Sequence, residues 1–170
     1  MPPVDTEHTE QSGVSARAEI ARRALEEVCS GRELRGIPDV YHADFVDHVN
    51  DLEYRGHEGA RRSVALYLEL FADLRFIVED QVVQDDRVAS RWTLRGTHLG
   101  RDVTLRGIVI SRFEDDRIIE DWATSDTLEI ARQLGVWRSL LLLITHGKLL
   151  RATRDDARKA AELAGRSVSS

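Results

Sequence analysis

The sequence predicts an α+β fold in which N-terminal helices cover one face of a curved antiparallel sheet. In the first half of the chain apolar residues recur at helical spacing, and in the second half extended segments are joined by short polar turns. Short connections between strands indicate antiparallel neighbours. The apolar stripes of the helices can be sheltered from water only against one face of that sheet.

Helices are expected in the N-terminal part of the chain, after a polar tail. Residues 1–14 show no apolar period, and we expect them to be disordered. Ser15 can cap a first helix that ends near Gly31. Its apolar residues fall three and four positions apart: Ile20, Ala21, Ala24, Leu25 and Val28. Next we expect a helix over 34–42, a strand over 45–49, a loop over 50–56 and a helix carrying Val64, Leu68 and Phe71 that ends near Asp73.

The sheet is expected in the second half of the chain. Its extended segments span 74–84, 87–99, 102–114 and 117–125, with turns at Asp85-Asp86, Gly100-Arg101 and Asp115-Asp116. Residues 136–148 and 152–166 are rich in Ala, Arg and Glu and are expected to be helical. The predicted organisation is therefore a disordered tail (1–14), one domain (15–135) and a helical C-terminal extension (136–170).

Composition limits the classes of function. A chain of 170 residues, 42% hydrophobic and 32% charged, fits one domain with a core and a ligand-sized cavity. With a net charge of −6 and no basic block among aromatics, we expect no nucleic-acid partner. The single Cys29 excludes an internal disulfide, and no Cys/His spacing resembles a zinc site, so neither metal nor cofactor is expected.

Targeting patterns are also missing from the sequence. The first residues are acidic and polar, unlike a signal peptide. The longest apolar run, Leu140 to Ile144, is far shorter than the roughly 20 residues that a membrane span needs. We therefore expect no membrane segment, and a cytoplasmic location.

The segment from Gly96 to Gly135 carries a family resemblance. It reads Gly96-Thr97-His98-Leu99-Gly100, then Ile-Val-Ile-Ser-Arg-Phe at 108–113, Asp-Arg-Ile-Ile-Glu-Asp-Trp at 116–122, Asp126, and Gln133-Leu134-Gly135. This pattern resembles the SnoaL-like polyketide cyclases, small enzymes of the nuclear transport factor 2-like fold, over roughly residues 17–135. The resemblance implies a cone-shaped cavity and a small polyketide-like substrate.

Three polar positions of the family pattern are not polar in this sequence. Many family members carry an acid/base aspartate at the position of Ala123, and aldol-type members often carry Gln-x-His at Gly107 and Val109. Many relatives also insert several residues after Gly100, which this chain lacks. Strict alternation would place Ile119, Asp121 and Ser125 on the cavity side with Ala123, and Ile118, Glu120 and Trp122 on the opposite side.

Asp121 is the strongest candidate acid/base group, because it is the cavity-facing carboxylate nearest the vacant position; the alternative is a polar residue near a strand edge. Asp47 and His48 are further candidates, of which at most one can face the cavity. His98 either lines the cavity mouth or holds the adjoining loop. Tyr41 and Tyr54 could donate to a carbonyl or serve in packing. The predicted substrate-binding residues are Tyr41, Tyr54, Trp92, Leu94, Gly107, Val109, Ile119 and Ala123.

The face of the sheet turned away from the cavity is expected to be apolar too. This face is expected to carry Ile108, Ile110, Ile118 and Trp122, with Arg112 and Glu120 as an ion pair among them. A sheet that is apolar on both faces needs cover on both. Because the helices cover only one face, the sequence predicts a homodimer packed through the other.

Three functions remain open. A ring-forming cyclase could hold a flexible chain in its reactive geometry, since orientation alone can lower a barrier by several kcal/mol; a [4+2] closure of the kind attributed to the cyclase of indane-type polyketides would fit. The second function keeps acid/base chemistry on Asp121, as an ester cyclase, epoxide-opening cyclase or isomerase. The third is a non-catalytic binding or dimerisation module. The first is preferred on sequence alone.

Overall fold

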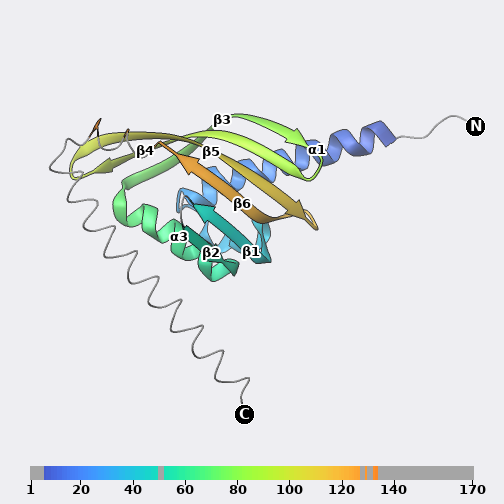
Figure 1. Ribbon diagram of the computed structural model, residues 1–170, viewed down its shortest axis with the longest axis horizontal. Coiled ribbons are helices and arrows are strands. Elements are labelled where there is room, and N and C mark those ends of the chain that lie inside the picture. The colour runs from blue at the N-terminus through green and yellow to red at the C-terminus, as the bar shows by residue number, and fades with distance from the viewer. Residues whose placement is uncertain (1–5, 50–51, 127–128, 130–131, 134–170) are drawn as a thin grey trace, which may run out of the picture. The chain divides into compact units, whose positions relative to one another are not determined.

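The structure, a computed structural model, describes residues 6–49, 52–126, 129 and 132–133 (Figure 1). The chain divides into two compact units, Met1–Glu129 and Ile130–Ser170. The helices expected at 136–148 and 152–166 lie outside the described residues.

Helices come first, as predicted. Helix α1 (Thr6–Arg23) begins well before Ser15, within the stretch expected to be disordered, and continues as the π-helix η1 (Ala24–Cys29). The 3₁₀-helix η2 (Leu34–Gly36) and the short helix α2 (Ile37–Val40) follow, and Pro38 suits the first turn of α2. Helix α3 (Gly56–Leu70) follows the first two strands and places its buried residues Ala60, Ser63 and Val64 toward the sheet.

The described strands are β1 (Tyr41–Val49), β2 (Leu52–Arg55), β3 (Ala72–Gln84), β4 (Arg87–His98), β5 (Arg101–Glu114) and β6 (Arg117–Ser125). They form one six-stranded mixed sheet in the order β2-β1-β6-β5-β4-β3. The predicted α+β class is confirmed, but the sheet is not antiparallel throughout, because β1 pairs with β6 in parallel. Strand β2 also occupies part of the segment expected to be a loop.

The turns between β3, β4, β5 and β6 are short. Asp85-Asp86 and Asp115-Asp116 are turns as predicted. The turn between β4 and β5 is Leu99-Gly100, one residue earlier than expected. Both of its residues have positive φ (49° and 74°), which the favoured two-residue hairpin turns of the primed type require.

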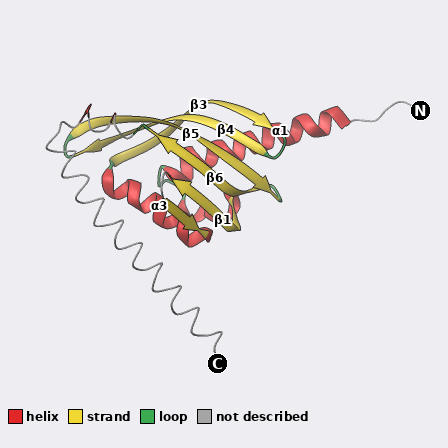
Figure 2. Ribbon diagram, in the orientation of Figure 1, coloured by secondary structure: helices red, strands yellow, loops and turns green. Residues whose placement is uncertain are grey.

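All helices of this unit that pack on the sheet lie on one face, which we call the inner face (Figure 2). Helix α3 packs on β1, and α1 with η1 packs on β3. Apolar side chains from both layers fill the space between them: Ala21, Ala24, Val28, Ile37, Val40, Tyr41, Phe45, Ala60, Val88, Phe113 and Ile118. We call the opposite side of the sheet the outer face.

A bulge in β6 changes which residues face inward. Arg112 of β5 lies opposite Glu120, but the next residue, Phe113, lies opposite Ile118, so Ile119 has no partner in the register. Ile118 is fully buried in the core. The prediction that Ile118 faces outward with Glu120 is therefore wrong. The prediction that strict alternation places Ile119 in the cavity wall is wrong for the same reason.

Among the described residues, no helix has the length and apolarity needed to cross a membrane.

Candidate functional site

Two carboxylates meet on the inner face. Strands β1 and β6 run in parallel with Asp47 directly opposite Asp121. Residues opposite each other on neighbouring strands point to the same face. Asp121 is only 7% exposed. The structure thus brings together two residues that the sequence nominated separately.

Two serines bind these carboxylates. The hydroxyl of Ser63, on α3, donates to Asp47 Oδ2 at 2.9 Å. Ser111, on β5, lies directly opposite Asp121 and forms a hydrogen bond with its side chain. Asp121 Oδ1 is buried and has no hydrogen-bond partner among the described residues. That oxygen is therefore free to carry a proton.

The surroundings of Asp47 and Asp121 raise the pKa values of the two carboxyl groups to different extents. Burial raises the pKa of Asp121 well above its ordinary value, and the nearby charge of Asp47 raises it further. Burial also raises the pKa of Asp47, to about 6, against the stabilising hydrogen bond from Ser63. With a pKa of about 6, Asp47 is largely ionised at neutral pH, whereas burial and the charge of Asp47 favour the neutral form of Asp121.

Tyrosines and the cysteine surround the pair. Tyr54 lies opposite Asp47 on β2 and is 8% exposed. The hydroxyl of Tyr41 lies 3.6 Å from Cys29 Sγ, so it already has a polar partner. Burial raises the pKa of Tyr41 and Tyr67 and raises that of Cys29 to about 12. These groups are therefore neutral and can act only as hydrogen-bonding groups.

His48 points away from the pair, to the outer face. Its Nε2 lies 3.0 Å from Glu120 Oε1, and its ring stacks on Trp122 with centroids 5.9 Å apart. Glu120 also accepts from Arg112 at 3.0 Å, which confirms the predicted ion pair. The assignment of His48 as a candidate for the cavity is wrong, because its neighbour Asp47 takes the inward position.

His98 holds the junction of α3 and β3. Its Nδ1–H donates to the carbonyl oxygen of Leu70, the last residue of α3, and its ring meets the edge of Phe71. Of the two roles considered for His98, the structure therefore shows the one that fixes a neighbouring loop.

The inner face beside the pair is apolar. Trp92, Leu94 and Val109 are all at most 5% exposed, as their predicted inward orientation requires, and Ala123 lies opposite Val109. Their role in substrate binding stays a prediction.

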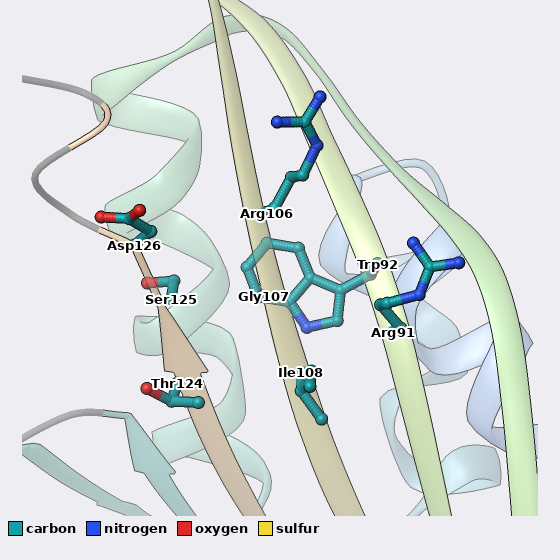
Figure 3. Close-up of a pocket in the computed structure, with 8 residues that line it drawn as sticks. All are labelled: Arg91, Trp92, Arg106, Gly107, Ile108, Thr124, Ser125 and Asp126. Carbon is teal, nitrogen blue, oxygen red and sulfur yellow. The ribbon is translucent and has the colours of Figure 1, made fainter. Parts of the chain in front are cut away.

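Gly107 leaves room for an aromatic ring. A Cβ atom at this position would lie 2.3 Å from Cζ2 of Trp92 and 2.5 Å from the carbonyl oxygen of Thr124. Figure 3 shows the indole lying across the Gly107 backbone. The residues around it form a pocket of about 440 Å³, which we call the Gly107 pocket: Arg91, Trp92, Arg106, Gly107, Ile108, Thr124, Ser125 and Asp126 (Figure 3).

No metal site is formed by the described residues. Among them, no group of three or more His, Cys, Asp or Glu side chains is placed to hold a metal ion.

Sequence reasoning missed Ser63, Ser111, Cys29 and Tyr67. Ser111 follows Val109 by two residues, so alternation could have placed it on the inner face. Ser63 precedes Val64 of the predicted helical stripe, but no local pattern shows which strand that helix contacts.

The sequence matches the model of the SnoaL-like polyketide cyclase family over residues 19–134. No curated protein matches it.

Solved structures agree with this match. IdmH, a candidate polyketide cyclase from Streptomyces antibioticus, is 27% identical, with a TM-score of 0.62 over 71% of this chain and 99% of IdmH. A loop-truncated variant of IdmH is 28% identical, with a TM-score of 0.63 over 70% of this chain and 99% of the variant. A candidate polyketide cyclase from Bacillus cereus is 25% identical, with a TM-score of 0.65 over 72% of this chain and 82% of that one. Because the family match covers most of the chain and the fold agrees, the chain belongs to the SnoaL-like polyketide cyclase family.

Proposed function

We propose that the protein closes or isomerises a polyketide-like ketone by general acid–base catalysis, with Asp47 as the base and Asp121 as the acid. Membership of the family supports a cyclase or related activity. The observation that carries the mechanism is the pair of inward carboxylates, opposite each other in register and differing in protonation. Two titratable groups with separated pKa values are a common basis for acid/base assignment.

Each carboxyl group has the protonation state that its role needs. Asp47, with a pKa of about 6, is a carboxylate at pH 7 and can take a proton from a carbon next to a carbonyl. Burial favours the neutral form of Asp121, which can donate a hydrogen bond to the carbonyl oxygen as negative charge develops there. The enolate then forms a carbon–carbon bond to a second carbonyl of the same molecule, and the resulting alkoxide recovers the proton held by Asp47. Protons and electrons balance without a cofactor.

Shape-directed closure is the second candidate. Gly107, Val109 and Ala123 bring no polar group to the inner face, and Trp92 and Leu94 extend its apolar surface. Such a surface could hold a flexible chain in a reactive conformation. We prefer the acid/base function because an apolar wall alone gives no reason to bury two carboxylates, whose charged forms are costly to desolvate.

Hydrogen–deuterium exchange tests the proposal without knowledge of the natural substrate. The probe is 2-tetralone, a flat ketone whose exchange next to the carbonyl in D2O is followed by NMR. We expect catalysed exchange to rise with pH through about 6, as Asp47 ionises. Asp47→Asn and Asp121→Asn should each lower the catalysed rate by roughly a hundredfold.

The control is Asp44→Asn, the same change on an exposed residue of the same strand, which should leave the exchange rate unaltered. Wild-type exchange no faster than the buffer rate would refute the acid/base proposal. Equal rates in wild type and both inward variants would refute it as well.

A further inference from the structure

Three arginines on the outer face have no acidic partner among the described residues. Arg75 of β3 lies directly opposite Arg95 of β4. Arg106 of β5 lies opposite Thr93, which is two residues from Arg95 on β4, so Arg106 and Arg95 are diagonal neighbours. All three are exposed. In the part of the chain that the structure describes, none of their side chains forms an ion pair or hydrogen bond, and we call them the arginine cluster (Arg75, Arg95 and Arg106).

The cluster differs from the other arginines of this face. Arg91 pairs with Asp80, and Arg112 pairs with Glu120. Like charges directly opposite on neighbouring strands destabilise a sheet. The sequence holds 30 acidic residues against 24 basic ones, so partners are not scarce in the chain. An unpaired cluster in an acidic protein is therefore suited to an anion from outside.

The Gly107 pocket adjoins this cluster. Arg106 belongs to both, and Figure 3 shows its side chain extending from β5 away from the indole of Trp92. Ile108, 45% exposed, gives the pocket an apolar side on the outer face. A volume of about 440 Å³ lies within the range of small-molecule sites.

We infer that the Gly107 pocket and the arginine cluster together bind an organic anion, a molecule with an apolar body and a terminal carboxylate or phosphate. The apolar body would lie against Ile108, in the pocket that the buried, inward-facing Trp92 ring lines across Gly107. The oxyanion would lie between Arg106 and Arg95, since guanidinium groups match both carboxylate and phosphate geometry. This site is separate from the Asp47–Asp121 pair, so it does not depend on the proposed reaction.

Calorimetric titration with simple amphiphiles tests the site. The probes are decanoate and decyl phosphate, with 1-decanol as the neutral analogue and inorganic phosphate as the anion without an apolar body. We expect one or both of the charged amphiphiles to bind at least tenfold more tightly than either control probe. Decanoate alone would identify a carboxylate site, and decyl phosphate alone a phosphate site.

Single substitutions show where on the protein the amphiphile binds. Arg95→Gln and Arg106→Gln should each weaken it about three- to tenfold, and both effects should shrink at high salt. The matched control is Arg62→Gln, an exposed arginine on α3, which should change nothing. Asp121→Asn should also leave the affinity unchanged, which separates this site from the inner face. In NMR spectra the indole N–H signal of Trp92, assigned with Trp92→Phe, should shift on binding.

Three results would overturn the inference. One is equal affinity for decanoate, decyl phosphate and 1-decanol. Another is unchanged affinity in both arginine variants. The third is a loss of binding in Asp121→Asn equal to that in Arg106→Gln, which would place the ligand on the inner face.

Discussion

Asp47 and Asp121 are the same chemical group in two environments. Asp47 receives a hydrogen bond from Ser63, which favours its charged form, whereas one buried oxygen of Asp121 has no donor among the described residues. These surroundings favour the neutral form more strongly at Asp121 than at Asp47. Because burial raises both pKa values, each group keeps its proton to a higher pH in the folded state than in the unfolded chain.

This difference predicts a pH-dependent stability. A carboxyl whose folded pKa lies above its unfolded value contributes stability that is complete below the unfolded pKa and is lost as pH rises through the folded one. For Asp47 the two values are 3.8 and about 6. We expect its contribution to the free energy of unfolding to fall by roughly 1 to 2 kcal/mol between pH 5 and pH 7.5.

Urea denaturation across that range measures the effect. Asp47→Asn should be more stable than wild type at pH 7.5, and its advantage should decrease toward pH 5. Asp44→Asn, on the exposed end of the same strand, should follow the wild-type curve. Parallel curves for wild type and Asp47→Asn would show that Asp47 is not buried as a perturbed acid.

At the scale of the elements, local patterns predicted most of the sheet. Strands β3 to β6 match their predicted bounds within two residues, because alternation and short turns are properties of neighbouring residues. The parallel pairing of β1 with β6 joins segments far apart in sequence, and no local pattern encodes it.

The same limit explains the errors in the candidate site. Alternation shows that Asp47 and His48 face opposite ways, but only the pairing of β1 with β6 and the packing of α3 decide which one faces inward. The bulge at Ile119 reverses the orientation expected for Ile118, and a bulge depends on the register with β5.

Gly107 shows how one strand adapts to its neighbour. A side chain at this position would collide with the Trp92 ring, so the two residues share a single space. The glutamine that the family resemblance places here has no room beside that ring. The absence of a polar group at position 107 is therefore coupled to the tryptophan at position 92.

This coupling predicts the effect of Gly107→Ala. The added methyl group would overlap Trp92 Cζ2 and the Thr124 carbonyl, and overpacking of this kind costs about 1 to 3 kcal/mol. Trp92→Ala should itself be destabilising, but adding Gly107→Ala to it should cost less than in wild type. Denaturant titration of the four proteins gives the coupling energy. Strictly additive effects would contradict the shared space.

The control is Gly13→Ala. Gly13 lies in α1, where a Cβ atom meets nothing within 4 Å, so alanine should be neutral or slightly stabilising.

At the scale of the whole molecule, the outer face has two parts. One is the arginine cluster. The other, which we call the apolar row, crosses β3, β4, β5 and β6 and consists of Val82, Ala89, Ile110 and Trp122. Val82 is 69% exposed and Ile110 39% exposed. Ile110 lies four positions after Arg106 along β5, about 13 Å of extended chain. An apolar contact on the row would therefore leave the arginine cluster open.

The sequence predicts a homodimer through the outer face, and we propose that the apolar row forms its interface, because exposed apolar side chains on the uncovered face of a sheet gain from burial. Ile110→Glu would place a buried charge in such an interface, so it should convert the dimer to a monomer in sedimentation equilibrium while the circular dichroism spectrum stays unchanged.

Val14→Glu is the matched control, since Val14 is similarly exposed (41%) but lies on α1. A monomeric wild type, or a dimer that survives Ile110→Glu, would refute this interface. Arg106→Gln should leave the dimer intact, because the arginine cluster lies outside the apolar row.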